Sequence, residues 1–370
     1  MNIYRIIDAE INRVSEGLRV IEDISRFSLE NKDLSSRLRN LRHKTRKKIT
    51  VLNDKLIQNR NSESDIGLSI SQNTVEPIHT SKFEQRLPLN KNINAYNKID
   101  SKNSIKDLVT ANFKRIQEGL RSLEESIKVA NYYKISKVYE QLRFDAYTLE
   151  KDFNLVLFKL IRRSSLNTNL YGITGSKFSK GRSNKEVVAA MIKGGIKIIQ
   201  YREKEKSLKE KYTECITIRK LTKEANVTFI VNDDITLAQI IDADGIHLGQ
   251  DDLPLPEVRS IVGEKMILGL STHSPQQALE AVKVGADYIG VGPIYKTSTK
   301  KNVCAPVGYE YLEWVVENIQ LPFVAIGGIK IHNIQEIINR KAECIAMVTE
   351  IVGADNIEET VKQIRGEFRI

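Results

Sequence analysis

The chain has 370 residues, of which 41% are hydrophobic, so it is long enough to bury the cores of two domains. It has no run of about eighteen apolar residues, and its first residues lack the apolar core of a signal peptide, so we expect a cytoplasmic protein without a membrane span. Its three cysteines, Cys215, Cys304 and Cys344, are scattered without metal-ligand spacing, which is typical of thiols in a reducing compartment.

The formal net charge of +10 belongs to the N-terminal part of the chain. Residues 1–163 contain 31 Lys and Arg against 21 Asp and Glu, whereas residues 164–370 contain 26 of each kind. A basic module could bind nucleic acid, but here the basic side chains are interleaved with acidic ones and no recognition-helix signature is present. Nucleic-acid binding is therefore the weaker alternative for residues 1–163.

An internal repeat organises this N-terminal part. Residues 7–23 recur 102 positions later as residues 109–125, with seven identical positions. The identical residues of the first copy are Ala9, Arg13, Glu16, Gly17, Leu18, Arg19 and Glu22. Because the apolar positions of both copies keep helical spacing, we predict a helix over each.

Further helical patterns complete the N-terminal domain. We predict a second helix over residues 35–55, a long polar loop over 58–106, one long helix over 135–160 and a linker over 164–169. Residues 1–163 then form a mainly α-helical bundle of two similar hairpins. A glycine inside a helix costs about 1 kcal/mol relative to alanine, so the repeated Gly17 and Gly119 indicate either close helix packing or access to a ligand.

Eight short apolar segments alternate with amphipathic stretches in residues 164–370. This alternation predicts an α/β fold, namely a (β/α)₈ TIM barrel. The expected strands are residues 170–174, 196–201, 228–231, 245–248, 266–271, 287–291, 322–326 and 343–348.

Acidic residues follow two neighbouring strands of this barrel. Asp233 and Asp234 follow the third strand, and Asp251 and Asp252 follow the fourth. Carboxylates at the carboxyl ends of barrel strands are suited to Mg²⁺, which proteins hold through one or two carboxylates together with substrate phosphate oxygens and water. The alternative is that these acids cap the helices that follow.

Other strand ends carry groups suited to anions. Gln200, Arg202 and Lys204 recur with period two, so they share one face of an extended segment. The residue pairs 327–328 (Gly-Gly) and 348–349 (Val-Thr) follow strands seven and eight, where barrels commonly bind phosphate. These positions predict a site for a phosphorylated substrate.

Six of these motifs, taken in order and with their spacing, resemble the thiamine-phosphate synthase family from about Asn167 to the C-terminus. They are residues 170–174, 200–204, 231–233, 247–252, 290–295 with 299–300, and 325–329. The resemblance implies the joining of hydroxymethylpyrimidine diphosphate to thiazole phosphate, giving thiamine phosphate and pyrophosphate, with Mg²⁺ as the metal. The chain departs from the family at Lys296 and Ser298, where the family often has proline, and at Thr349, where serine is common.

The resemblance also implies roles for individual residues. Mg²⁺ would be bound by Asp233 and Asp252. The pyrimidine diphosphate would be contacted by Gln200, Arg202, Lys204, Asn232, Ser271 and Lys300, of which Arg202, Ser271 and Lys300 would be catalytic. The thiazole phosphate would be held by Thr297, Thr299, Gly328, Val348 and Thr349.

The chemistry of this reaction agrees with these residue types. Capture of a pyrimidine methylene cation by the tertiary thiazole nitrogen removes no proton, so the site needs charge neutralisation more than a general base. The barrel sequence contains no paired nucleophile and base. We expect His247, a lone histidine on a strand, to pack or hydrogen-bond rather than to act in catalysis.

The N-terminal part resembles the domain fused to some thiamine-phosphate synthases and assigned as an alternative hydroxymethylpyrimidine phosphate kinase. No phosphate-binding loop of the Gly-x-x-x-x-Gly-Lys-[Ser/Thr] type supports this chemically. If it is a kinase, the repeat would bring Arg19 and Arg121, with Glu16 and Glu118, to a shared cleft. A structural or oligomerisation module is the alternative, and the sequence leaves homo-oligomer formation open.

Overall fold

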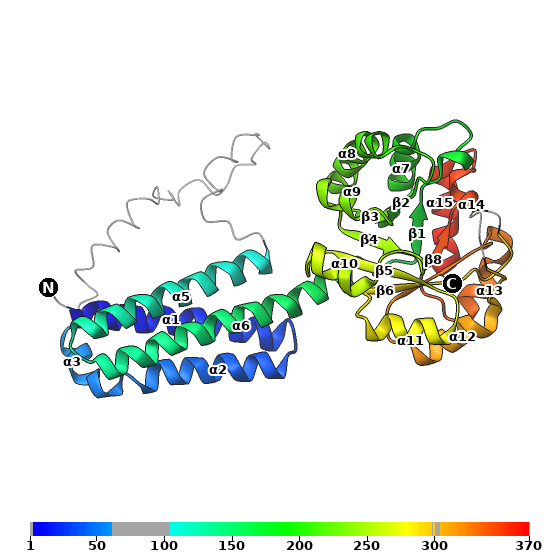
Figure 1. Ribbon diagram of the computed structural model, residues 1–370. Helices are drawn as coiled ribbons and strands as arrows, with labels where there is room; N and C mark the ends of the chain where they lie inside the picture. Colours follow the sequence, from blue (N-terminus) through cyan, green and yellow to red (C-terminus); the bar gives the residue numbers. More distant parts are fainter. Residues whose placement is uncertain (1–2, 61–103, 298, 300–303, 370) are drawn as a thin grey trace, which may run out of the picture. The chain divides into compact units, whose positions relative to one another are not determined.

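The computed structural model describes residues 3–60, 104–297, 299 and 304–369 (Figure 1). Residue contacts divide the chain into two units that meet between Leu157 and Phe158. Among the described residues, no helix is both long enough and apolar enough to cross a membrane.

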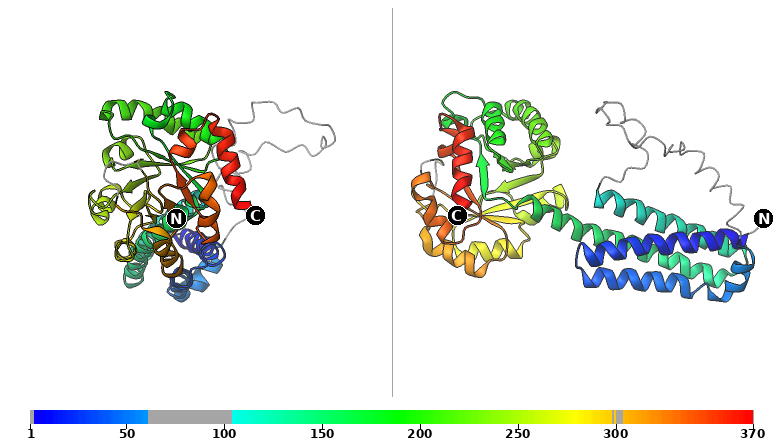
Figure 2. Two further views of the ribbon diagram at one scale, coloured as in Figure 1. Left: turned by 90° about the vertical axis from the view of Figure 1, so that its right-hand side faces the viewer. Right: turned by 180° about the vertical axis from the view of Figure 1, so that it is seen from behind.

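The first unit is a bundle of four long helices (Figures 1 and 2). These are α1 (Ile3–Phe27), α2 (Lys32–Lys47), α5 (Ile105–Val129) and α6 (Tyr133–Ser165), of which α6 continues past Leu157 into the second unit. A 3₁₀ turn (Thr50–Leu52) and the short helix α3 (Asn53–Gln58) follow α2. Side-chain caps fix two helix starts, because Asn31 accepts a hydrogen bond from Leu34 N and Ser104 accepts one from Asp107 N. The mainly helical N-terminal region expected from the sequence is confirmed.

The repeated glycines lie where α1 and α5 pack against each other. A side chain at Gly17 would meet Ile116 and the backbone of Asn112, and one at Gly119 would meet Val14 and Glu10. These contacts are equivalent by the 102-residue repeat, so the two helices cross with local two-fold pseudo-symmetry. The helical cost of glycine is thus offset by close packing, which is the first of the two roles considered for these residues.

Several predicted boundaries in this unit differ from the structure. The second helical stretch is broken after Lys47, and the expected polar loop ends earlier because α5 begins at Ile105. Residues 61–103 of that loop lie outside the described residues. The linker expected from Ser164 begins inside α6, which runs to Ser165. The division of the chain at residue 163 remains a prediction.

The second unit is a closed barrel of eight parallel strands, each hydrogen-bonded to the next, with β8 returning to β1. The strands are β1 (Leu170–Ile173), β2 (Ile198–Tyr201), β3 (Thr228–Asn232), β4 (Gly245–Leu248), β5 (Ile267–Thr272), β6 (Tyr288–Val291), β7 (Phe323–Ile326) and β8 (Ile345–Met347). The TIM-barrel prediction is confirmed, with all eight strands at the expected places.

Helices follow the strands and cover the barrel (Figures 1 and 2). The α-helices are α7 (Asn184–Lys193), α8 (Leu208–Glu224), α9 (Ile235–Ile240), α10 (Leu255–Val262), α11 (Pro275–Lys283), α12 (Gly308–Asn318), α13 (Ile334–Asn339), α14 (Thr349–Val352) and α15 (Ile357–Gly366). Short 3₁₀ segments are η2 (Ser176–Phe178), η3 (Ile331–Asn333) and η4 (Glu367–Arg369). Capping boxes at Ser183 and Ser207 begin α7 and α8, so local sequence fixes where these helices start.

Side chains from opposite strands fill the inside of the barrel. Tyr171, Ile230 and Tyr288 are buried there together with Val324 and Ala346. A separate and larger core lies between the strands and the covering helices. The interior is therefore packed, and the strand ends above it are fixed in position relative to one another.

Candidate active site

A cavity of about 810 Å³ is lined by residues at the carboxyl ends of the barrel strands and the loops that follow them. It brings together most of the residues singled out in the sequence: Gln200, Arg202, Lys204, Asn232, Asp233, Asp252, Ser271, Thr297, Thr299, Gly328, Val348 and Thr349. Lys300 and Ser298 lie outside the described residues. The site is thus assembled from loops far apart in the chain, as TIM-barrel active sites are.

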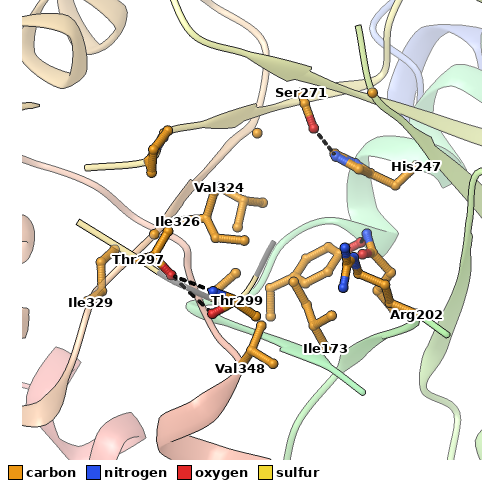
Figure 3. Close-up of a pocket in the computed structure, with 18 of the residues that line it drawn as sticks. Ile173, Arg202, His247, Ser271, Thr297, Thr299, Val324, Ile326, Ile329 and Val348 are labelled. Carbon is orange, nitrogen blue, oxygen red and sulfur yellow. Dashed lines mark hydrogen bonds between the residues drawn. The ribbon is translucent and has the colours of Figure 1, made fainter. Parts of the chain in front are cut away.

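Arg202 follows β2 and points into this cavity (Figure 3). Its backbone N–H donates to Thr174 Oγ1 over 2.9 Å, which fixes the chain where the strand ends. Its Nε atom is buried and has no hydrogen-bond partner among the described residues. Burial lowers the pKa of the guanidinium, with the Asp233 and Glu203 carboxylates acting in the opposite direction. A buried cation with an unused donor favours an anionic ligand.

Two carboxylates stand beside this cation. Asp233 adopts a left-handed backbone conformation with φ of 62° and pairs with Lys204. Burial raises the pKa of Asp233, but hydrogen bonds from Lys204 and Asp252 outweigh it, so the pKa lies below its usual value. Burial and the neighbouring Asp233 charge raise the pKa of Asp252, although the Gly249 N–H donates to this carboxylate over 2.6 Å. Two carboxylates in such proximity favour binding of a cation between them.

The helix-capping alternative applies to a neighbouring residue. Asp234 is the N-cap of α9, and its side chain accepts a hydrogen bond from Leu237 N over 3.0 Å. Asp233 instead faces the cavity. Both acids follow β3 in the sequence, but in the structure Asp234 caps a helix and Asp233 lines the cavity.

Threonines and glycines line another part of the cavity. The Thr297 and Thr299 hydroxyls lie 3.0 Å apart, and Figure 3 draws the hydrogen bond between these two residues. Gly327 and Gly328 have φ values of 104° and 67°, a conformation that glycine adopts without strain. A side chain at Gly328 would overlap the loop at Tyr295 and Lys296, so these glycines let two loops pack closely beside the cavity.

Some residues of the cavity were not singled out in the sequence. Lys330 lies two residues after Gly328, and its Nζ is 2.8 Å from both Thr349 Oγ1 and Glu350 Oε2. Its place on the loop after β7 was the signal that could have identified it. Tyr171 and Tyr288 also line the cavity, but each reads as an ordinary core residue of a strand.

His247 hydrogen-bonds through both ring nitrogens. Its Nε2 is 2.9 Å from Ser271 Oγ, a contact drawn in Figure 3, and its Nδ1 is 2.9 Å from Tyr288 Oη. The hydrogen-bonding role expected for this histidine therefore agrees with the structure.

The charged residues that the N-terminal repeat shares between its two copies are arranged differently from expectation. Arg19 pairs with Asp23, and Arg121 pairs with Glu124 and Glu125, so each arginine is engaged within its own helix. Both arginines are exposed, as are Glu16 and Glu118. The shared cleft suggested for these four side chains is therefore not formed by contacts among the described residues.

Buried carboxylates occupy another equivalent position of the repeat. Glu22 and Glu124 are each 1% exposed. Glu22 binds Arg39 and Arg42 of α2, whereas Glu124 binds Arg143 of α6 as well as Arg121 and Lys128 of its own helix. These ion pairs tie each copy of the repeat to the helix that follows it.

Comparisons with known proteins agree with both units. Residues 170–351 match the family described as thiamine monophosphate synthase, and residues 5–86 and 89–152 match the ThiD2 family. A thiamine-phosphate synthase from Pelotomaculum thermopropionicum is 62% identical over 210 residues, covering 56% of this chain and 96% of that protein.

A second relative spans both units. A thiamine-phosphate synthase from Prochlorococcus marinus subsp. pastoris is 35% identical over 357 residues, covering 96% of this chain and 92% of that protein. The solved structure of thiamine phosphate pyrophosphorylase from Pyrococcus furiosus is 33% identical, with a TM-score of 0.51, and the match covers 56% of this chain and 96% of that one. The chain therefore belongs to the thiamine-phosphate synthase family, with an N-terminal part that matches the ThiD2 family.

Proposed function

We propose that the barrel cavity is the active site in which this transferase makes thiamine phosphate. The substrates are 4-amino-2-methyl-5-(diphosphooxymethyl)pyrimidine and 4-methyl-5-(2-phosphooxyethyl)thiazole, and the second product is pyrophosphate. The observation that carries the assignment of the cavity is the buried, unpartnered Nε of Arg202 beside the Asp233 and Asp252 carboxylates. A diphosphate with a divalent cation satisfies both features at once.

The pyrimidine diphosphate is assigned to the side of the cavity formed after β2, β3 and β5. Arg202 and Lys204 supply positive charge to the diphosphate, and Asn232, Gln200 and Ser271 supply neutral hydrogen-bonding groups. Lys300 is assigned to the same substrate by the family motif alone. Lys204 must exchange its contact with Asp233 for the substrate, whereas the Nε of Arg202 has no hydrogen bond to give up among the described residues.

The two carboxylates fit Mg²⁺. Among the described residues, no group of three or more His, Cys, Asp or Glu side chains is placed to hold a metal. A pair of carboxylates is nevertheless what Mg²⁺ needs when substrate phosphate oxygens and water complete its coordination. Asp233 and Asp252 would hold the ion, which when bound supplies positive charge opposite the diphosphate. The raised pKa of Asp252 agrees with this, because burial and the Asp233 charge disfavour its carboxylate form and a bound cation would favour it.

The thiazole phosphate is assigned to the side formed after β6, β7 and β8. Thr297, Thr299 and Thr349 offer hydroxyl groups, and Gly328 and Val348 offer backbone amides. Lys330 adds a cation at 2.8 Å from the Thr349 hydroxyl. Lys330 thus provides a second positively charged subsite, so the two phosphorylated substrates can bind in the same cavity at different positions.

The reaction proceeds by a dissociative route in this proposal. The bond between the pyrimidine methylene carbon and the diphosphate oxygen breaks, and its electron pair leaves with pyrophosphate. The lone pair of the thiazole nitrogen then forms the new carbon–nitrogen bond, and no proton is removed. Arg202, Lys300 and the hydroxyl of Ser271 stabilise negative charge on the leaving group, so the site needs fixed positive charge and donors rather than a base.

The direct test is mass analysis of the products formed by the full chain from both substrates and Mg²⁺. Thiamine phosphate and pyrophosphate should appear together, and neither should appear when one substrate is omitted. Lys204→Gln should slow the reaction. Lys223→Gln is a matched control, since both lysines are about half exposed and each pairs with an aspartate, but Lys223 is outside the cavity. Equal rates for the two variants would contradict the assigned diphosphate side.

The second candidate function concerns the helical bundle, and the match to the ThiD2 family favours it. We propose that residues 1–163 phosphorylate hydroxymethylpyrimidine phosphate with ATP, which would supply the diphosphate that the barrel consumes. The full chain, given ATP and the monophosphate but no thiazole substrate, should accumulate the diphosphate and ADP. Their absence would leave the bundle as a structural or oligomerisation module.

A further inference from the structure

A continuous line of hydrogen-bonded side chains crosses the inside of the barrel next to the cavity. Gln200 Nε2 is 3.1 Å from Tyr171 Oη, which is 2.8 Å from Tyr288 Oη. Tyr288 Oη is 2.9 Å from His247 Nδ1, and the other ring nitrogen of His247 is 2.9 Å from Ser271 Oγ. We call these five residues the relay. Its two ends are groups assigned to the pyrimidine diphosphate.

The barrel interior is built around the middle of the relay. Tyr171 and Tyr288 are 2% and 1% exposed, and their rings lie 6.0 Å apart. Gly269 of β5 faces Tyr288 of β6 in the strand register, and a side chain at Gly269 would overlap the tyrosine ring. Glycine at this position therefore leaves the space that the Tyr288 ring occupies. Burial raises the pKa of both tyrosines, so both hydroxyls keep their protons at neutral pH.

The direction of the hydrogen bonds follows from one end. The amide nitrogen of Gln200 can only donate, so Tyr171 Oη accepts from it. If each hydroxyl of the line accepts one hydrogen bond and donates one, the single proton of Tyr171 is left for Tyr288 Oη. By the same rule the Tyr288 proton is left for His247 Nδ1, 2.9 Å away. A neutral imidazole with an accepting Nδ1 carries its proton on Nε2, and that proton goes to Ser271 Oγ.

We propose that the relay is a positioning device that fixes the Nε2–H form of His247, so that Ser271 presents a proton and Gln200 presents a carbonyl oxygen to the pyrimidine diphosphate. This inference rests on the proposed function of the cavity. Tyr171, Tyr288 and His247 act through Ser271 and Gln200 and are positioning residues.

The resulting polarity matches the substrate. The exocyclic amine is the one N–H donor of the pyrimidine diphosphate, and its ring nitrogens and phosphate oxygens are acceptors. The side-chain carbonyl oxygen of Gln200 is matched to the amine, and the Ser271 proton is matched to any of the acceptors. The reverse direction would turn a lone pair of Ser271 toward an electron-rich substrate, which disfavours binding.

The imidazole form can be measured directly. We expect nitrogen NMR of the full chain, labelled at histidine, to show His247 as a neutral ring protonated at Nε2. The chain has only 5 histidines, and the signal that disappears in His247→Gln is assigned to this residue. A ring protonated at Nδ1, or at both nitrogens, would overturn the proposal. This measurement requires no turnover, so it separates failure of the relay from failure of the proposed reaction.

Kinetics test whether the relay matters for function. Tyr288→Phe keeps the ring but removes the donor to His247, so Ser271 can turn its proton toward the imidazole. We expect kcat/KM for the pyrimidine diphosphate to fall about fivefold, the value of one ordinary hydrogen bond, with KM for thiazole phosphate unchanged.

Tyr201→Phe is the matched control. Tyr201 is also a buried strand tyrosine with a hydrogen-bonded hydroxyl, but its partner is Glu214, 2.7 Å away and outside the relay. This variant should keep both kinetic constants. If Tyr288→Phe and Tyr201→Phe behave alike, or if Tyr288→Phe impairs both substrates equally, the relay is only a packing element.

Discussion

Replacing Arg202 with methionine should remove most of the activity and at the same time make the protein more stable. The guanidinium lies in the cavity with its Nε buried and unpartnered, and burial lowers its pKa. In the absence of substrate, folding therefore removes a positive charge from water without supplying a hydrogen-bond partner for its Nε among the described residues. Methionine is unbranched and apolar, so it fills similar space without this desolvation cost.

The size of the activity loss follows from the hydrogen bonds that Arg202 is free to make. A hydrogen bond to a charged group contributes about 1.5–3 kcal/mol, and an arginine can bind a phosphate group with two. Since the Nε of Arg202 has no partner to give up among the described residues, we expect a loss of about 3 kcal/mol, roughly a hundredfold in kcat/KM for the pyrimidine diphosphate. Lys204 must first leave Asp233, so its removal should cost less.

Steady-state kinetics and thermal unfolding of the same preparations measure both effects. Arg340→Met is the control, because Arg340 lies outside the cavity and has partners, with its Nε 2.9 Å from Glu313. It should keep activity and gain no stability. An Arg202→Met protein that is less stable than the parent, or that keeps most of its activity, would refute the view that Arg202 binds an anion at a cost in folding stability.

Further predictions concern the metal, the two phosphates and the bundle. Asp252→Asn should raise the Mg²⁺ concentration needed for half-maximal activity, and an unchanged requirement in a titration would argue against this ligand. Lys300→Ala should lower kcat and Thr349→Ala should mainly raise KM for thiazole phosphate; the same kinetic pattern for both would remove the two-subsite assignment. Glu22→Gln should lower the free energy of unfolding by about 3 kcal/mol, since it breaks a buried ion pair, as denaturant unfolding followed by circular dichroism would show. Burial raises the pKa of Glu22 and Glu124, but their arginine and lysine partners outweigh burial, so both pKa values lie below the usual 4.5. The stabilisation of the bundle by these ion pairs is therefore present above pH 4.5 and is lost as the pH falls further. A bundle that becomes more stable on acidification below pH 4.5 would contradict this prediction.

The sequence predicted the barrel well because strands and helices leave local periodic signals. The eight apolar segments and the residues directly after them carry both the fold and most of the site. The period-two pattern of Gln200, Arg202 and Lys204 was sufficient to place all three in the cavity, although β2 itself ends at Tyr201.

The relay was beyond such reasoning because its contacts join distant strands. Tyr171 and Tyr288 are 117 positions apart and meet only when the barrel closes. Each looks like an ordinary aromatic residue of a buried strand, and Gly269 looks like an interruption. That these residues lie together becomes visible only when the structure shows which side chains share the barrel interior.

In the helical bundle, the sequence predicted the helices but not the arrangement of their charged side chains. The repeat predicted equivalent helices, but it could not tell which charges turn outward. Arg19 and Arg121 are exposed, whereas Glu22 and Glu124 are buried and form ion pairs with arginines of the following helices. Those partners come from α2 and α6, which the repeated motif does not include.

The bond that breaks in the pyrimidine substrate is the most direct test of the central claim, a cavity that stabilises a leaving diphosphate. The full chain would receive substrate carrying a heavy oxygen isotope in the bridge between the methylene carbon and the diphosphate, together with thiazole phosphate and Mg²⁺. Mass analysis should find all of the label in pyrophosphate and none in thiamine phosphate. Label that stays on the pyrimidine, or absence of thiamine phosphate altogether, would contradict the mechanism.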